Sequence, residues 1–180
     1  MNTPLSTSPD DLRDLLRSAV QRLEAAQLAS RSWALPEAHR DVARAYAGLG
    51  AWPSARSMLD AALRWARAIG AGDLVVDLLC DRVEMLAQES DALEREQRGL
   101  GRSARERARD LVFEASRLVA RVADPHWEIS VLLRLSDVLD RFGDRDDATL
   151  LQVRALQLTV GSTLPPTPPG AEDASRAQRH

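Results

Sequence analysis

Histidine and cysteine, the side chains that most often bind metals or attack substrates, are few and scattered in this sequence. The histidines are His39, His126 and His180, and Cys80 is the single cysteine. Metal sites and nucleophile–base pairs require several such groups at defined spacings, and these four residues form no such pattern. We therefore expect no catalytic residue, no metal, no cofactor and no enzyme activity.

Aspartates are concentrated near residue 140, where their density is that of a calcium loop. The group consists of Asp137, Asp140, Asp144, Asp146 and Asp147. It lacks the alternating ligands, the central glycine and the terminal glutamate of a calcium-binding loop. Helix capping and solvation explain these residues better than metal binding does.

Arginine is concentrated in the six basic residues from Arg95 to Arg109, a density that nucleic-acid phosphates could use. Glutamates and an aspartate are interleaved with them, which is typical of solvated helix faces. The whole chain has 180 residues, a net charge of −3 and no lysine. These features favour neither a nucleic-acid partner nor an anionic membrane surface.

The apolar periodicity predicts an all-α fold of about seven helices, rich in alanine and leucine. Ser8 before Pro9 and Asp124 before Pro125 mark helix starts, and Gly50, Gly70 and Gly143 mark ends. Ser103 and Asp144 are the expected caps of two further helices. The helices are expected at about residues 9–29, 36–50, 53–70, 73–98, 103–122, 125–143 and 144–161.

An internal repeat with a constant shift of 93 residues organises these helices into hairpins. Its paired positions are Ala43 with Ser136, Tyr46 with Leu139, Gly50 with Gly143, Ala55 with Ala148, and Ala62 with Ala155. Ala115 is the equivalent residue of a middle hairpin, 53 residues after Ala62 and 40 before Ala155. Three hairpins are therefore expected, with about 13 extra residues of the middle one between Glu89 and Gly101.

Over residues 36–161 the chain resembles the tetratricopeptide repeat family. The family pattern places a small residue and an aromatic on the first helix, glycine at the turn, and alanines around a large apolar residue on the second. The first copy carries Ala43, Tyr46, Gly50, Trp52, Ala55, Leu59 and Ala62, and the middle copy carries Val83, Leu86, Ala108, Val112 and Ala115. The resemblance implies a stack of antiparallel hairpins, an α-solenoid, that binds a protein or peptide.

By this resemblance, the first helix of each hairpin lines a concave binding face. The implied partner-binding positions are Glu37, Arg40, Arg44, Asp77, Asp81, Glu84, Arg134, Asp137 and Arg141. The groove would be basic at both ends and acidic in its centre, with Arg40, Arg44 and Arg134 as candidates to bind acidic groups of a peptide. An ordinary solvated helix face is the alternative. The family's carboxylate clamp is not expected, because lysine is absent and Asn2 is the single asparagine.

The segments outside the repeats complete the predicted organisation. Residues 1–8 are expected to be a flexible N-terminus, residues 9–161 a helical repeat domain, and residues 162–180 a disordered Pro-rich tail. The leading helix should cover the first hairpin, or else exchange between two copies in a homodimer. No signal peptide or membrane span is recognisable, so a cytoplasmic location is expected.

Two functions besides a general protein-interaction module remain open at this point. One is a small chaperone or secretion accessory protein that shields a segment of its partner. The other is a regulatory module that senses a ligand. Trp33 and Trp127 are either exposed interface anchors or half-buried packing residues, whereas Trp52 and Cys80 are expected in or near the core.

Overall fold

The computed structural model describes residues 8–95, 101–122 and 124–163, and the chain in these ranges is almost entirely helical. Seven α-helices and one short 3-10 turn occur in the described ranges, with no strand among them. They are α1 (Pro9–Leu28), η1 (Ser32–Ala34), α2 (Leu35–Gly48), α3 (Trp52–Ala68), α4 (Gly72–Arg95), α5 (Gly101–Val119), α6 (Pro125–Phe142) and α7 (Arg145–Thr163). The predicted all-α fold is confirmed.

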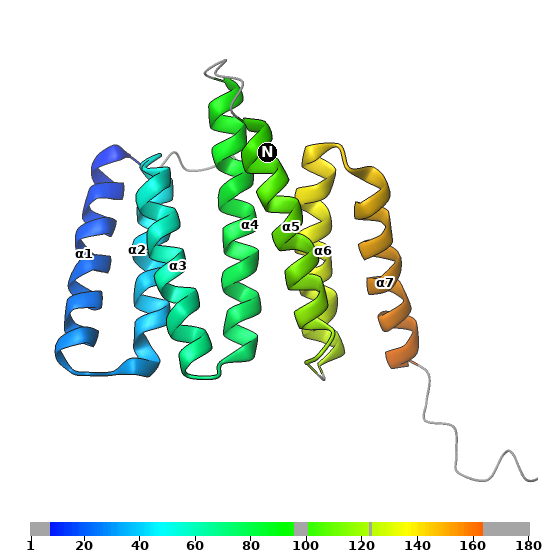
Figure 1. Cartoon of the computed structure of the whole chain (residues 1–180), viewed down its shortest axis with the longest axis horizontal. Coiled ribbons are helices and arrows are strands. Elements are labelled where there is room, and N and C mark those ends of the chain that lie inside the picture. The colour runs from blue at the N-terminus through cyan, green and yellow to red at the C-terminus, as the bar shows by residue number, and fades with distance from the viewer. Residues whose placement is uncertain (1–7, 96–100, 123, 164–180) are drawn as a thin grey trace, which may run out of the picture.

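The helices form one row of antiparallel hairpins (Figure 1). The most extensive helix contacts are those of α2 with α3, α4 with α5, and α6 with α7. Neighbouring hairpins join through α3–α4, α4–α6 and α5–α6 contacts. At the two ends of the row, α1 packs on α2 and α7 packs on α6 (Figure 1). The leading helix therefore lies on the first hairpin, as predicted.

Local sequence signals set several of the helix ends. The Ser8 side chain accepts a hydrogen bond from the backbone N–H of Asp10, and the Asp11 carboxylate accepts one from the N–H of Ser8, so α1 begins with a capping box. Asp124 caps α6 by accepting from the N–H of Trp127 at 3.1 Å. Gly143 ends α6 with φ +81°, a left-handed conformation in which a Cβ would be strained.

Several boundaries differ from their predictions by one to three residues, among them the ends of α3 at Ala68 and of α5 at Val119. α5 begins at Gly101, so Ser103 lies inside its first turn and is not the cap. Close packing explains the glycine there, because a Cβ on Gly101 would lie 2.9 Å from Ser90 Oγ of α4. α7 continues to Thr163, two residues beyond the predicted end. The expectations for residues 1–7, for the end of the fourth helix at Arg98 and for the tail from 164 onward lie outside the described residues.

Small buried side chains bring the helices of each hairpin together. All of the small repeat positions are at most 2% exposed, namely Ala43, Ala55, Ala62, Ala115, Ser136, Ala148 and Ala155. Around them the core consists mainly of leucine and valine from α3 to α7, and Tyr46 and Trp52 pack against it half-buried. Both turn glycines of the 93-residue repeat have positive φ, +72° at Gly50 and +81° at Gly143. Four of the five paired positions of the repeat therefore have matching environments, whereas Tyr46 is half-buried and its counterpart Leu139 is fully buried.

Candidate functional site

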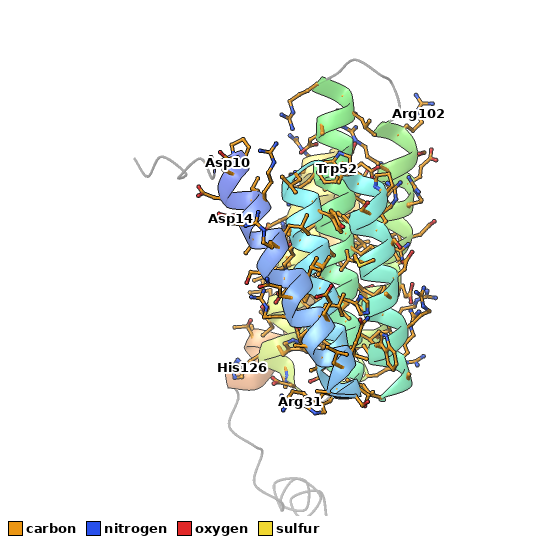
Figure 2. All side chains as sticks on the ribbon, turned by 90° about the vertical axis from the view of Figure 1, so that its left-hand side faces the viewer. Asp10, Asp14, Arg31, Trp52, Arg102 and His126 are labelled. Atoms are coloured by element: carbon orange, nitrogen blue, oxygen red, sulfur yellow. The ribbon has the colours of Figure 1, made fainter. Side chains whose placement is uncertain are left out.

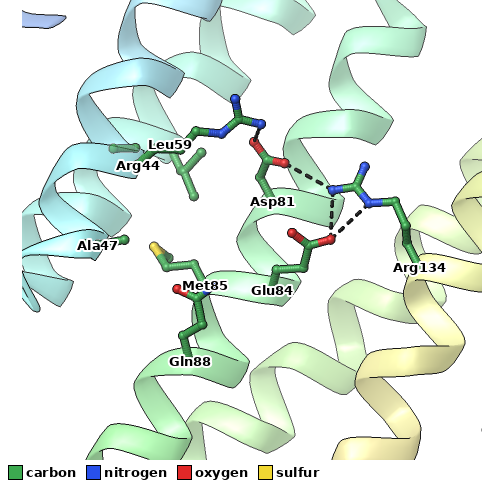
Figure 3. Close-up of a pocket in the computed structure, with 10 residues that line it drawn as sticks. Arg44, Ala47, Leu59, Asp81, Glu84, Met85, Gln88 and Arg134 are labelled. Atoms are coloured by element: carbon green, nitrogen blue, oxygen red, sulfur yellow. Dashed lines mark hydrogen bonds and ion pairs between the residues drawn. The ribbon is translucent and has the colours of Figure 1, made fainter. Parts of the chain in front are cut away.

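Asp81 of α4 is the centre of an ion-pair network that connects α2, α4 and α6. Arg40 of α2 donates to both of its carboxylate oxygens, with Nε 2.5 Å from Oδ2 and Nη2 3.2 Å from Oδ1. Arg44 lies one turn further along α2 and brings Nη2 to 3.0 Å from Oδ2. Arg134 of α6 approaches from the other side, with Nη2 3.3 Å from Oδ1. Figure 3 shows Asp81 between Arg44 and Arg134.

The remaining carboxylates of the network neutralise the arginines further. Arg134 Nε donates to Glu84 Oε1 at 3.0 Å, and Asp77 lies 4.0 Å from the same guanidinium. Arg40 also contacts Glu37 of its own helix at 3.3 Å. Three arginines thus face four carboxylates, so the cluster as a whole carries little net charge.

Burial determines how each charged group in the network behaves. The side chains of Asp81 and Arg40 are 5% and 13% exposed, whereas that of Arg44 is 56% exposed. The hydrogen bond to Asp81 raises the pKa of Arg40. Burial alone would lower the pKa of Arg134, but the charge of Glu84 and its hydrogen bond outweigh that effect and raise it. Arg40 and Arg134 therefore remain charged, and Arg44 has the most exposed side chain of the three arginines.

A groove of about 300 Å³ opens beside the network, between α2 and α4. The backbones of these two helices make almost no close approach, in contrast to α4 and α6. Leu59 of α3 and Met85 of α4 supply apolar surface (Figure 3), and small residues of α2 form the opposite wall. The lining residues are Ala43, Arg44, Ala47, Gly48, Leu59, Asp81, Glu84, Met85, Gln88 and Arg134.

The structure brings seven of the nine predicted binding residues into one cluster. These seven are Glu37, Arg40, Arg44, Asp77, Asp81, Glu84 and Arg134. Arg141 lies apart from them and pairs with Asp91 of α4 at 2.5 Å. Asp137 is exposed on α6 and makes no ion pair within the described part of the chain.

Sequence reasoning missed the apolar and small residues that form the groove itself. Met85 and Gln88 follow Asp81 and Glu84 at spacings of four residues, so helical periodicity could have placed them on the same face. Ala47 follows Arg44 by three residues, so the same periodicity could have placed it on the face of α2, but its access to the groove depends on the separation of α2 from α4. The contribution of Leu59 depends in the same way on how α3 lies behind these two helices.

Two features of the described residues bear on metal and thiol chemistry. No group of three or more His, Cys, Asp or Glu side chains in these ranges is arranged to hold a metal ion. The Cys80 thiol is 1% exposed, and burial raises its pKa to about 12, so at neutral pH it is a protonated core residue. The groove therefore offers apolar contact and ion pairing.

The tryptophans divide between core and surface. Trp52 and Trp127 are half-buried and pack against the main core, as the packing interpretation of each predicts. Trp33 lies on η1 and is 68% exposed. Trp33 is thus available for contact with another molecule, although it lies outside the groove.

Comparison with known proteins assigns no family to this chain. No protein-family model matches this chain, and no match was found among curated proteins. None of the helices in the described ranges combines the length and apolar character needed to cross a bilayer. The functional conclusion therefore rests on the row of hairpins and on the groove between α2 and α4.

Proposed function

We propose that this chain is a non-catalytic interaction module of the tetratricopeptide type that binds a peptide segment of a partner protein. The binding site is the groove between α2 and α4. The observation that carries the proposal is the groove itself, which has Leu59 and Met85 as apolar surface beside a half-exposed arginine and carboxylate on its rim. Such a site buries an apolar side chain and pairs the polar groups that flank it.

The dimensions and composition of the groove favour a peptide side chain over a whole small molecule. A volume of about 300 Å³ lies at the lower limit of small-molecule pockets. Arg44, Glu84 and Gln88 present both hydrogen-bond donors and acceptors at its edge. An extended peptide has donors and acceptors along its backbone, so it can satisfy these groups on either side of one inserted apolar residue.

Arg44 is the residue best placed to anchor an acidic group of the peptide. Arg40 is engaged by both oxygens of Asp81 and is nearly buried, so recruiting it would break a partly desolvated ion pair. Arg44 contacts Asp81 through one nitrogen and is more than half exposed. Its remaining donors can bind a carboxylate of the partner.

The proposal is tested by selecting peptides on the purified full chain from a displayed random library. The variant Ala47→Trp fills the groove with a large side chain, and Ala29→Trp makes the same change at an exposed site at the end of α1. Selected peptides should carry an apolar residue next to an acidic one. They should lose at least about tenfold in affinity for Ala47→Trp and retain it for Ala29→Trp.

Two results would count against this site. One is a selection that enriches no sequence over the unselected library. The other is a set of peptides that bind Ala47→Trp and Ala29→Trp equally well, because these peptides would bind outside the groove. Circular dichroism of both variants establishes that the helical fold is intact before affinities are compared.

A further inference from the structure

The outward face of α7 exposes apolar side chains at the end of the row. Leu150, Val153 and Leu156 are 67%, 46% and 63% exposed. At 100° per residue they fall within about a third of the helix circumference, so they form one stripe. The opposite face of α7 supplies Ala148 and Ala155 to the buried contact with α6. α7 is therefore apolar on two sides.

The helix at the other end of the row has the opposite character. α1 carries exposed charges along its outer side, among them the pairs Asp10 with Arg13 and Asp14 with Arg17. Figure 2 looks onto this end of the molecule and labels Asp10 and Asp14. A polar outer face is what the terminal helix of a soluble helical stack requires. α1 meets that requirement, whereas α7 does not.

Charge is also depleted along α7. From Ala148 to Thr163 the single ionisable side chain is Arg154. This arginine donates to Glu128 of α6, with Nη2 2.6 Å and Nε 2.9 Å from Oε1, so its charge is already paired. Depletion of charge around exposed large apolar residues distinguishes the core of a protein interface from ordinary surface.

We propose that α7 is a dimerisation surface and that its occupant is a second copy of this chain. A twofold axis places a face against itself, so unpaired charges of one sign would be brought together. From Ala148 onward the α7 face avoids this repulsion because Arg154, the one charged residue there, is neutralised within the subunit. Stacking α7 on α1 of another copy would instead bury apolar side chains against charged ones.

Three residues of the stripe, Leu150, Val153 and Leu156, are evenly spaced along the helix, which suits an antiparallel pairing. Val153 lies midway between Leu150 and Leu156, three residues from each. A twofold axis near Val153 places Leu150 of one subunit beside Leu156 of the partner subunit, and the reverse. The two Val153 side chains then face each other at the centre. This contact is separate from the groove between α2 and α4 and leaves that groove open.

Sedimentation equilibrium of the full chain tests the proposal directly. The native chain should show a monomer–dimer equilibrium, and Leu156→Arg should weaken dimerisation by at least about tenfold because it buries two like charges. Leu28→Arg is the matched control, since Leu28 is 88% exposed on α1 and outside the proposed contact. It should dimerise like the native chain. Equal dimerisation of the two variants would overturn the proposal.

A cysteine variant tests the symmetry of the pairing. Val153→Cys should form a disulfide-linked dimer on mild oxidation, while Ser18→Cys on the exposed side of α1 should not. Native Cys80 is buried and does not compete. If the Val153→Cys variant stays monomeric and its new thiol is protected from reagents, another segment of the same chain covers the α7 face. If it stays monomeric and the thiol reacts freely, the α7 face is the binding surface of a different protein. Either result would overturn the proposal.

Discussion

Arg40 of α2 and Asp81 of α4 form a bidentate ion pair across a boundary where the two helix backbones make almost no close approach. Both side chains are largely buried, at 13% and 5% exposed. In such a pair the Coulombic attraction offsets the cost of desolvating each group, so losing one partner costs more than the pair contributes. The pair therefore links α2 directly to α4, beside the α3–α4 packing that joins the first hairpin to the second.

Replacing Asp81 by asparagine should destabilise the protein substantially. The substitution keeps the shape of the side chain but removes the buried counter-ion of Arg40 and leaves it only the half-exposed Glu37, at a cost of about 2–4 kcal/mol. Urea unfolding followed by circular dichroism measures the change. Asp137→Asn makes the same substitution at an exposed position of α6 and should change the free energy of unfolding by less than about 0.5 kcal/mol. Equal midpoints for the two variants would contradict this account.

Acidification should weaken the fold through His39. This side chain is 8% exposed, and its Nδ1 has no hydrogen-bond partner among the described groups. Burial, and then the charge of Arg64, lower the pKa of His39 below 6.5. The folded state thus disfavours the protonated form. The stabilisation is complete above pH 6.5 and is lost as the pH falls from there through the lower pKa of the folded protein.

The His39→Gln variant isolates this contribution. Native and variant chains are unfolded with urea at about pH 7.5 and about pH 5, and the difference between their free energies of unfolding is compared. The native chain should lose more stability on acidification than the variant does. If the two chains lose the same amount, His39 does not titrate as described.

Cys80 should resist thiol reagents in the folded protein. Its side chain is 1% exposed, so reagents cannot reach the sulfur. Burial also raises its pKa to about 12, so little of the reactive thiolate is present at neutral pH. Labelling by a chromogenic disulfide reagent should be slow in buffer and fast in denaturant. The Ser18→Cys variant supplies an exposed thiol on α1 as a control, and about one group per chain should then react rapidly in buffer.

Ala55→Leu should overpack the first hairpin. Ala55 is 0% exposed on α3, inside the main core, so extra methyl groups require neighbouring side chains to move. We expect a loss of about 1–3 kcal/mol in thermal or urea unfolding. Ala68→Leu places the same side chain at an exposed site of the same helix and should be nearly neutral. A native melting temperature for Ala55→Leu would show that the hairpin is not closely packed there.

Gly143→Ala should destabilise the third hairpin at its turn. Gly143 ends α6 with φ +81°, where an L-residue with a Cβ costs about 1–2 kcal/mol. Gly161→Ala is the control, because an added Cβ on that helical glycine of α7 meets nothing within 4 Å. Calorimetric melting should separate the two variants, with Gly161→Ala at or slightly above the native melting temperature.

Local chemistry made the helices predictable from sequence. The caps at Ser8 and Asp124 and the turn at Gly143 each depend on atoms a few residues apart, and the structure confirms all three. The small repeat residues Ala55 and Ala62 were predictable for a similar reason. Their size has one plausible use, which is close helix approach, and both are 0% exposed.

Contacts between helices that are distant in the sequence could not be predicted from local sequence patterns. Sequence analysis assigned Asp144 to a helix cap and Arg109 to a solvated face, yet the Asp144 carboxylate accepts hydrogen bonds from the Arg109 guanidinium 35 residues away. The charged face of α4 was expected from the resemblance to the repeat family. The pairing of Asp81 with Arg40 and Arg134 required the positions of α2 and α6. The outer stripe of α7 was missed because the inner stripe already accounted for that helix.

The loose boundary between α2 and α4 also has a mechanical consequence. Charged pairs hold the two walls of the groove together, whereas interlocked apolar side chains would resist any change in spacing. Guanidinium–carboxylate contacts can lengthen or exchange partners with little loss of buried apolar area, and added salt weakens the exposed ones. The spacing of the two walls therefore depends on ionic strength through the exposed contacts, such as that of Arg44 with Asp81. Under the proposed function, this would let one backbone fold accept inserted residues of different size.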